Sequence, residues 1–314
     1  MNVIDDTEID FDAYLEGPKE CANVRPASDW LEEVIEAFRT PPELTGVCLP
    51  WEKTRPILRL RRGELSIWPG MSGHGKSIMS GQVMLELMAQ GEKVCIASME
   101  MKPAETMQRM CRQAFGCNAP SVRDIRDFHR WTDGRLWLYD QRNSVTPDRI
   151  LAVARYSSAE LGVNHLVIDN LMTCGIAEDG DGWQSRQKEF ILALSCHAHD
   201  SRQAVHLLAH VRKQPDESKP PSKFDVRGSA SITDLADNVF TVWRNKPKEA
   251  AHDKGDSSKI DEADVLLVVD KCRHGTWEGR IQLWFDRNSQ LFLSEAGEHP
   301  KAMKIIDDSE QVEF

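Results

Sequence analysis

No stretch of the sequence approaches the roughly 20 consecutive apolar residues that a membrane-spanning helix requires. The N-terminal segment MNVIDDTEIDFD is acidic, whereas a secretory signal begins with basic residues and continues with an apolar run. The eight cysteines form no C-x-x-C pair and no cluster with histidine at the spacing of zinc ligands. These absences predict a cytoplasmic chain that neither enters a membrane nor holds a structural zinc ion, and whose cysteines are free thiols.

The net charge of −11 is concentrated at the two ends of the chain. Residues 1–36 contain 11 acidic and two basic side chains, and residues 295–314 contain six and two. The remaining middle part contains 35 basic and 33 acidic side chains and is nearly neutral. Bulk charge therefore gives no support for nucleic-acid binding, which would need a local basic surface.

Four segments are predicted along the chain. Residues 1–27 alternate acids with isolated apolar residues, which predicts a disordered acidic arm. Residues 28–54 form a connector that begins with an amphipathic helix over Asp29–Phe38, with Asp29 as its N-cap. Residues 55–294 alternate short apolar runs with helical segments, which predicts an α/β domain with a mostly parallel sheet. Residues 295–314 form an acidic C-terminal tail.

The expected strands of this domain are Leu65–Trp68, Val94–Ser98, Leu136–Tyr139, His165–Asp169, Val205–Ala209, Val239–Trp243, Val265–Val269, Ile281–Phe285 and Leu291–Leu293. Helices are expected after residue 75 and over 103–115, 146–162 and 185–199. The polar segments 212–226 and 245–262 are expected to be mobile loops.

The segment GMSGHGKS matches the phosphate-binding pattern G-x-x-x-x-G-K-[ST] between a predicted strand and a predicted helix. Gly70, Gly73 and Gly75 allow backbone N–H groups to close around phosphates, and the helix N-terminus adds partial positive charge. Lys76 is expected to reach the β- and γ-phosphates, and Ser77 to bind Mg²⁺. The pattern predicts a site for ATP or another nucleoside triphosphate.

Polar residues end three of the predicted strands. Asp169 ends an apolar strand and is expected to hold Mg²⁺ through water, while Glu100 follows another strand and is expected to polarise the attacking water. Glu100 also fits a helix N-cap or a solvated acid. His210 ends a third strand, where it would sense the γ-phosphate, although a single histidine is more often structural.

Two later segments carry cations. Arg227 and the N–H groups near Gly228 suit contacts with DNA backbone phosphates. Lys271 and Arg273 close a strand and suit insertion into another subunit's nucleotide site as an arginine finger, or else form an exposed basic strand edge.

Six segments together resemble the DnaB-type replicative ring helicases, most closely the helicase part of bacteriophage primase-helicases and mitochondrial Twinkle. They are, in order across residues 55–294, RRGELSIWPGMSGHGKS, ASMEM, LVIDN, LLAHVRK, DVRGSASITDLADNVF and KCRHGTWEG. The resemblance implies a RecA-like P-loop fold, a hexameric ring with ATP between subunits, and ATP hydrolysis coupled to DNA unwinding in a bacterial or phage-infected cell.

The resemblance also implies residue roles. Lys76, Ser77, Glu100, Asp169 and His210 would act within one subunit, and Lys271 and Arg273 would come from its neighbour. Arg212, Lys213, Arg227 and Gly228 would grip single-stranded DNA, Arg244 and Phe285 would sandwich the nucleotide base, and the helix over Asp29–Phe38 would pack on the next subunit.

No primase or zinc module precedes the connector, so primer synthesis is not expected. Residues Asp307–Phe314 resemble the acidic, Phe-terminated tail by which some phage helicases dock on their replicative polymerase, and equally fit a solubilising tail. Two other functions remain open: a RecA/RadA-like ATPase that depends on single-stranded DNA in recombination or loading, and an ATPase of the same fold that does not bind DNA.

Overall fold

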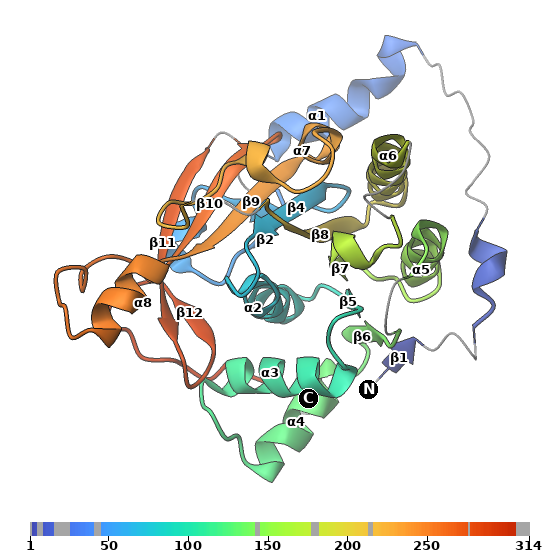
Figure 1. The fold of residues 1–314 in the computed structure, drawn as a ribbon. Helices are drawn as coiled ribbons and strands as arrows, with labels where there is room; N and C mark the ends of the chain where they lie inside the picture. Colours follow the sequence, from blue (N-terminus) through green and yellow to red (C-terminus); the bar gives the residue numbers. More distant parts are fainter. Residues whose placement is uncertain are drawn as a thin grey trace.

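A ten-stranded sheet forms the centre of the protein (Figure 1). The computed structural model describes residues 2–4, 9–15, 26–40, 45–141, 145–176, 182–212, 216–275 and 277–305. The strands are β1 (Asn2–Ile4), β4 (Leu65–Gly70), β5 (Val94–Ser98), β6 (Leu136–Tyr139), β7 (His165–Asp169), β8 (Ala204–His210), β9 (Asn238–Arg244), β10 (Val265–Cys272), β11 (Gly279–Asp286) and β12 (Leu291–Leu293), and β2 (Val47–Cys48) with β3 (Arg59–Leu60) forms a separate hairpin. The helices are α1 (Leu31–Arg39), α2 (Lys76–Ala89), α3 (Pro103–Phe115), α4 (Val122–Thr132), α5 (Pro147–Ala159), α6 (Trp183–Ser201), α7 (Ser231–Leu235) and α8 (Lys246–Asp253).

The sheet order is β1-β6-β5-β7-β8-β4-β9-β10-β11-β12. Strands β1 to β9 in this order run parallel, and β10, β11 and β12 add to the edge in antiparallel pairs. The strands predicted from apolar runs all form, and the prediction of an α/β fold with a mostly parallel sheet is confirmed. Parallel strands lie between helical layers, which is why they read as continuous apolar runs.

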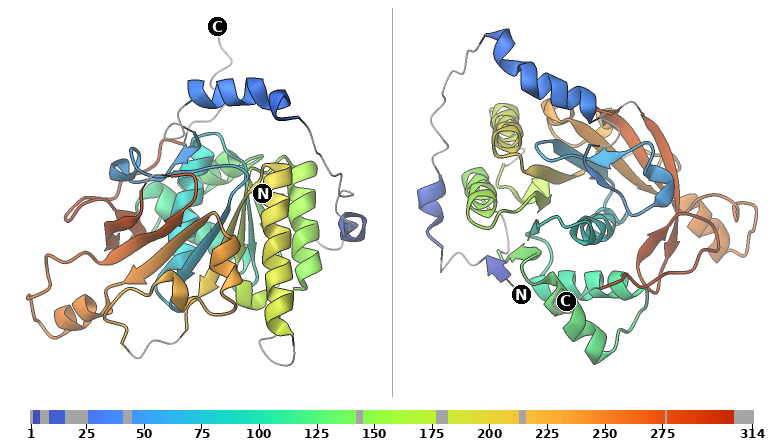
Figure 2. Two further views of the ribbon diagram at one scale, coloured as in Figure 1. Left: turned by 90° about the horizontal axis from the view of Figure 1, so that it is seen from above. Right: turned by 180° about the vertical axis from the view of Figure 1, so that it is seen from behind.

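Helices cover both faces of the sheet (Figures 1 and 2). Helices α5 and α6 bury Ile150 and Phe190 against one face, and α2, α3 and α4 bury Val83, Met110 and Phe128 against the other. The two cores hold the parallel strands rigidly, so the loops at their carboxyl ends are fixed in position.

Several predictions about the segments outside the sheet are corrected. Strand β1 pairs with β6, and Phe11, which is 1% exposed, packs edge-on against Tyr139 and Tyr156. Disorder is therefore the wrong prediction for residues 2–4 and 9–15. Burial of one aromatic ring among alternating acids left no periodic signal in the sequence.

The helical predictions need three corrections. Helix α1 begins at Leu31 after a short 3-10 turn, so Asp29 is not its N-cap. Helix α4 was not expected, although Ser121 and Asp124 form a capping box at its start. Helix α8 lies within the expected loop 245–262 and is capped by Asn245, whose side chain accepts from the Lys248 N–H. Short polar helices of this kind have weak periodicity and depend on their caps.

The described cysteines are free, as expected. None of the described helices combines the length and the apolar character needed to cross a bilayer. Part of the segment 295–314 packs on the domain, since the Met303 N–H donates to the Ala114 carbonyl at 2.7 Å. The tail residues Asp307–Phe314 lie outside the described residues.

Candidate active site

The phosphate-binding pattern forms a loop between β4 and α2. Gly73 and Gly75 have φ values of +76° and +90°, which side chains with a Cβ rarely adopt. A Cβ on Gly70 would lie 2.6 Å from the Val242 carbonyl oxygen. The strand, the loop and the helix thus occur where the sequence predicts them, and the three glycines are required by the local geometry.

Lys76 lies inside this loop. Its side chain is nearly buried, and its Nζ donates to the carbonyl oxygens of Gly70 and Met71 at 2.9 and 3.0 Å. Burial lowers the pKa of Lys76 to about 8, against the opposing effect of Asp169 and Glu100. An entering anion would stabilise the ammonium in its charged form, so the site favours a phosphate group.

The two predicted carboxylates meet at the carboxyl edge of the sheet. Strands β5 and β7 are neighbours with Ser98 opposite Asp169, and the Met99 N–H donates to the Asp169 carbonyl at 3.0 Å. Asp169 is 5% exposed and follows four apolar strand residues, whereas Glu100 is exposed over about half of its side chain. The predicted meeting of both acids beside the phosphate loop is confirmed.

Ser77 and Asp169 suit a magnesium ion. Burial raises the pKa of Asp169, and the Ser77 hydroxyl, which hydrogen-bonds to its carboxylate, lowers it. No group of three His, Cys, Asp or Glu side chains that could hold a metal occurs among the residues that the structure describes. Mg²⁺ keeps waters and substrate phosphates as ligands, so one hydroxyl and one carboxylate fit it.

Asn170 joins the remaining catalytic candidates and was missed by the sequence analysis. Its Nδ2 donates to Glu100 Oε1 and to His210 Nε2, the latter at 3.1 Å. The His210 Nδ1 lies 3.4 Å from the Lys76 Nζ. Burial lowers the pKa of His210, and the nearby Lys76 lowers it further. An asparagine after a strand is usually read as a turn residue, and only its position next to Asp169 could have singled it out.

Arg109 of α3 is a second residue that the sequence did not reveal. It lines a small cavity with Ser77, Thr106 and Asp169. Burial lowers the pKa of the Arg109 guanidinium, while the Asp169 carboxylate raises it. A second cation besides Lys76 therefore acts on Asp169, from a helix position that nothing in the sequence distinguishes from a surface arginine.

The predicted base-binding residues lie together at the end of β9. The Arg244 guanidinium lies 5.4 Å from the centre of the Phe285 ring, and the Arg244 N–H donates to His74 Nδ1 at 3.0 Å. Glu249 of α8 forms an ion pair with Arg244 and a second with Lys246. Burial lowers the pKa of His74 to about 4, which leaves its ring neutral and able to accept the hydrogen bond.

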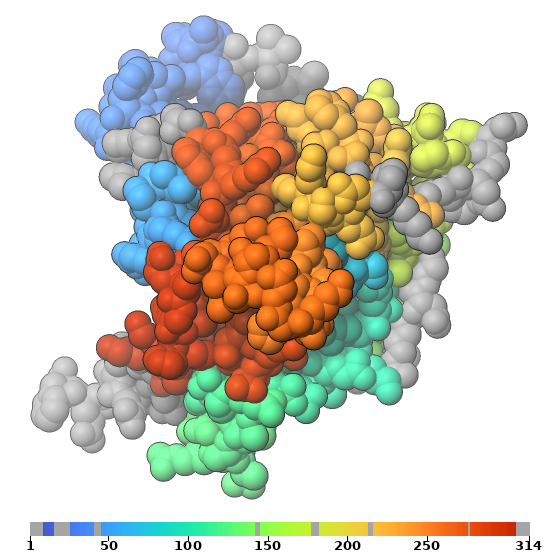
Figure 3. All heavy atoms as spheres, turned by 60° about the vertical axis from the view of Figure 1, so that its left-hand side comes forward, coloured from blue at the N-terminus to red at the C-terminus, as the bar shows by residue number. Residues whose placement is uncertain are grey.

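The α8 segment protrudes from the surface beside β11 and β12 (Figure 3). Glu249 was missed because it lies in this segment, which the sequence indicated as a loop. The ion pair between Glu249 and Arg244 fixes the guanidinium beside the Phe285 ring.

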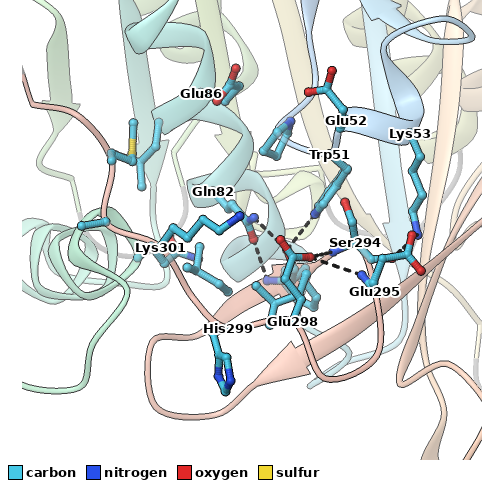
Figure 4. A pocket seen from close by; sticks show the side chains of 18 residues that line it. Trp51, Glu52, Lys53, Gln82, Glu86, Ser294, Glu295, Glu298, His299 and Lys301 are labelled. Carbon is cyan, nitrogen blue, oxygen red and sulfur yellow. Dashed lines mark hydrogen bonds and ion pairs between the residues drawn. The ribbon is translucent and has the colours of Figure 1, made fainter.

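A larger pocket of about 530 Å³ lies behind β12 (Figure 4). Trp51 Nε1 and Gln82 Nε2 both donate to the Phe292 carbonyl there, at 2.7 and 2.9 Å. A Cβ on Gly75 would lie 3.2 Å from the Phe292 ring. The predicted catalytic residues do not line this pocket, and its described walls support the phosphate loop from behind through Phe292.

Comparison with known proteins decides the family. The model of the DnaB-like helicase C-terminal domain matches residues 57–294. The chain belongs to this DnaB-like family. It is also 25% identical over 235 residues to the DNA helicase/primase of Enterobacteria phage T3, an alignment that covers 69% of this chain and 39% of that protein. The chain thus spans well under half the length of this relative.

Two solved structures share the fold. One, an ATPase domain solved by itself, aligns with a TM-score of 0.74 at 17% identity, covering 87% of this chain and 100% of that one. A DnaB-like replicative helicase, described together with its interactions with primase, aligns with a TM-score of 0.69 at 17% identity, covering 86% of this chain and 67% of that one. The expected RecA-like fold and family are therefore confirmed.

In this DnaB-like chain, Lys271 and Arg273 lie away from the phosphate loop of their own subunit. Strand β10 runs antiparallel to β9, so Lys271 pairs with Val239, and residue 272 pairs with Asn238, which lies beside Ser66 at the start of β4. Gly70, where β4 ends, is four residues further along that strand, or roughly 13 Å at the rise of a strand. The structure therefore does not bring these cations to the candidate site of the same chain.

Both cations are held in place. The Arg273 Nη1 lies 2.8 Å from the Asp237 carboxylate, which is fully buried. The Lys271 Nζ donates to the carbonyl oxygens of Thr233 and Asp234 at 3.0 and 2.9 Å. The pair is thus presented rigidly at the amino edge of the parallel strands.

The predicted DNA-binding residues that the structure describes lie next to His210. The Arg227 N–H donates to the His210 carbonyl at 2.8 Å, and an Arg212 Nη2 donates to the Gly228 carbonyl at 3.1 Å. Gly228 has φ +120°, and a Cβ there would lie 2.5 Å from the Gln187 side chain. Lys213 lies outside the described residues.

Proposed function

We propose that the protein is an ATP-driven replicative DNA helicase that forms a hexameric ring, moves along single-stranded DNA and separates the duplex ahead of it. One observation carries the proposal: a chain of the DnaB-like helicase family assembles its phosphate loop, two strand-end carboxylates and His210 at one edge of the sheet. Membership supplies the link to DNA unwinding, and the geometry supplies the means of hydrolysis.

Each residue of the site has a distinct task in this proposal. Lys76 and the loop N–H groups bind the phosphates, while Ser77 and Asp169 would hold Mg²⁺, which neutralises charge on the β- and γ-phosphates when bound. Glu100 orients the attacking water and accepts its proton. Water adds to the γ-phosphorus as the bond to the β-phosphate oxygen breaks, giving ADP and phosphate. His210 faces the Lys76 ammonium and is placed to detect the loss of the γ-phosphate.

The neighbouring subunit completes the site. Lys271 and Arg273 lie at the edge of the sheet opposite to the phosphate loop, so they suit a site on another copy. A rigid guanidinium that enters a site from outside stabilises the charge that develops on the transferred phosphoryl group. Hydrolysis then requires an oligomer.

The DNA is proposed to bind the loops that carry Arg212, Lys213, Arg227 and Gly228. Guanidinium and backbone N–H groups contact phosphates without reading the base sequence. Such contacts suit a motor that must travel over any sequence.

Strand displacement from a forked duplex with two single-stranded tails, in the presence of ATP and Mg²⁺, tests the proposal. Separation that depends on ATP supports a helicase. Hydrolysis stimulated by DNA without separation would favour a RecA/RadA-like ATPase, and hydrolysis without stimulation would remove DNA from the function.

Helix α1 is the proposed contact that closes the ring. Its apolar face is uncovered: Leu31, Val34 and Phe38 are 61%, 48% and 85% exposed, and α1 stands off the body of the domain (Figure 2). A groove of about 290 Å³ between α3 and α4 offers a complementary apolar surface that includes Met107 and Ile125. Acidic residues of α1 match arginines of α4, which favours α1 of a second copy as the occupant of the groove.

We expect Phe38→Glu to convert the assembly into smaller species, because it places a charge in an apolar contact. Native mass spectrometry at constant protein concentration measures the change. Glu33→Gln, on the opposite face of α1, serves as the control and should leave the ring intact. A ring that survives Phe38→Glu would exclude this role for α1.

Residues Asp307–Phe314 are proposed to dock on a replicative DNA polymerase. Deleting these eight residues is expected to abolish co-elution with the polymerase and to leave ATP hydrolysis unchanged. Unchanged co-elution after the deletion would exclude this role for the tail.

A further inference from the structure

Asn170 is held in one orientation by its hydrogen bonds. The residue is 1% exposed; its Nδ2 donates to Glu100 and His210, and its Oδ1 accepts from the Met172 N–H at 2.9 Å. A rotated amide would place Oδ1 against the Glu100 carboxylate and Nδ2 against the Met172 N–H. The amide therefore offers two N–H groups to two candidate catalytic side chains at once.

This orientation sets the direction in which His210 donates. Because Nε2 of His210 accepts from Asn170, the proton of the neutral ring resides on Nδ1. Nδ1 is the ring atom that faces the Lys76 Nζ, at 3.4 Å. His210 thus directs an N–H group toward the place where the phosphates are proposed to bind.

His210 is also joined to the proposed DNA loop through the backbone. Its carbonyl accepts from the Arg227 N–H at 2.8 Å, Val211 forms a bridge with Val226, and the Arg212 N–H donates to the Asp225 carbonyl at 2.8 Å. The end of β8 and the loop are therefore paired over three successive positions. A displacement of the loop carries His210 with it.

We propose that Asn170 is a positioning residue that couples DNA on the Arg227 loop to the placement of Glu100. DNA that moves the loop moves His210, and the shared amide transmits this movement to the carboxylate that orients the attacking water. Single-stranded DNA accelerates ATP hydrolysis through this connection. The inference rests on the roles proposed above for Glu100 and His210.

Two substitutions separate the amide N–H groups from the turn that Asn170 also caps. Asn170→Asp keeps an oxygen for the Met172 N–H but replaces both donors by a carboxylate oxygen that repels Glu100. Thr173→Val is the matched control, because Thr173 Oγ1 bonds to the backbone N–H and carbonyl of Asn170 at 3.3 and 2.7 Å and leaves the amide untouched.

The measurement is kcat and KM for ATP with and without oligo-dT on the assembled full-length protein. For Asn170→Asp, we expect the DNA-stimulated kcat to fall at least tenfold while KM for ATP changes less than about threefold, because Lys76 and Ser77 remain. Thr173→Val should retain the stimulation. Retention of the stimulation in Asn170→Asp would overturn the proposal, as would an equal loss in Thr173→Val.

Glu100→Gln distinguishes failure of this inference from failure of the proposed function. If Glu100→Gln hydrolyses ATP at the wild-type rate, the roles at the site are wrong and the inference falls with them. If Glu100→Gln is inactive while Asn170→Asp responds normally to DNA, the site assignment stands and only the coupling through Asn170 is wrong.

Discussion

Arg273→Ala is expected to lower ATP turnover on the order of 10³-fold or more while nucleotide binding survives. The guanidinium is proposed to reach the phosphates only across a subunit interface, because β10 carries it to the sheet edge opposite to its own phosphate loop. Steady-state hydrolysis and equilibrium binding of a fluorescent ATP analogue measure the two effects separately. Wild-type turnover in the variant would refute the assignment.

Arg273 also pairs with the buried Asp237, so the alanine variant needs a companion that preserves this pair. Arg273→Lys retains a positive charge for Asp237 but loses the planar fork, and it should keep the thermal stability while still losing turnover. Arg280→Ala, an exposed arginine on β11, controls for the removal of one positive charge.

Mixed assemblies identify the subunit that supplies Arg273. A ring of Arg273→Ala and Lys76→Met subunits contains interfaces in which an intact Lys76 faces an intact Arg273. Hydrolysis should reappear on mixing if the finger acts across the interface. Two inactive variants that stay inactive in every ratio would indicate action within one subunit.

Lys76→Met is expected to abolish hydrolysis and strand displacement without loss of stability. Lowering of the Lys76 pKa from its ordinary 10.5 to about 8 corresponds to a cost on the order of 3 kcal/mol in the nucleotide-free protein at neutral pH. Methionine fills a similar volume without this charge. We therefore expect Tm of the nucleotide-free variant at pH 7 to equal or exceed that of the wild type.

The pH dependence follows from the direction of the shift. Since the folded pKa lies below the unfolded one, the cost of burying Lys76 is full below about pH 8 and disappears as the pH rises above 10.5. The advantage of the methionine variant should shrink over this range in thermal melts. A variant that melts well below the wild type at pH 7 would contradict this account of Lys76.

The sequence predicted the parallel strands and the phosphate loop because both depend on local patterns. Apolar runs mark buried strands, and the glycines of the loop are required by backbone conformations within a few residues. The meeting of Glu100 and Asp169 was also predictable, since the carboxyl ends of neighbouring parallel strands share an edge.

Asn170, Arg109 and Glu249 were not predictable, because each acquires its role from a partner that lies on a different element. Asn170 bonds to Glu100 and His210, which lie 70 and 40 residues away. Glu249 reaches Arg244 only because residues 246–253 form a helix, and the polar composition of that segment indicated a loop. Side-chain register across separate elements is set by tertiary packing, which no local pattern encodes.

The reversal of chain direction at β10 constrains the symmetry of any assembly. The phosphate loop and the cationic pair occupy opposite edges of one sheet, so the contact that joins them uses two different surfaces of the chain. Such a heterologous contact repeats head to tail, and it generates either a closed ring or an open helix, but not a two-fold dimer. Every copy then faces the same way around the assembly, which gives the assembly an inherent direction of travel.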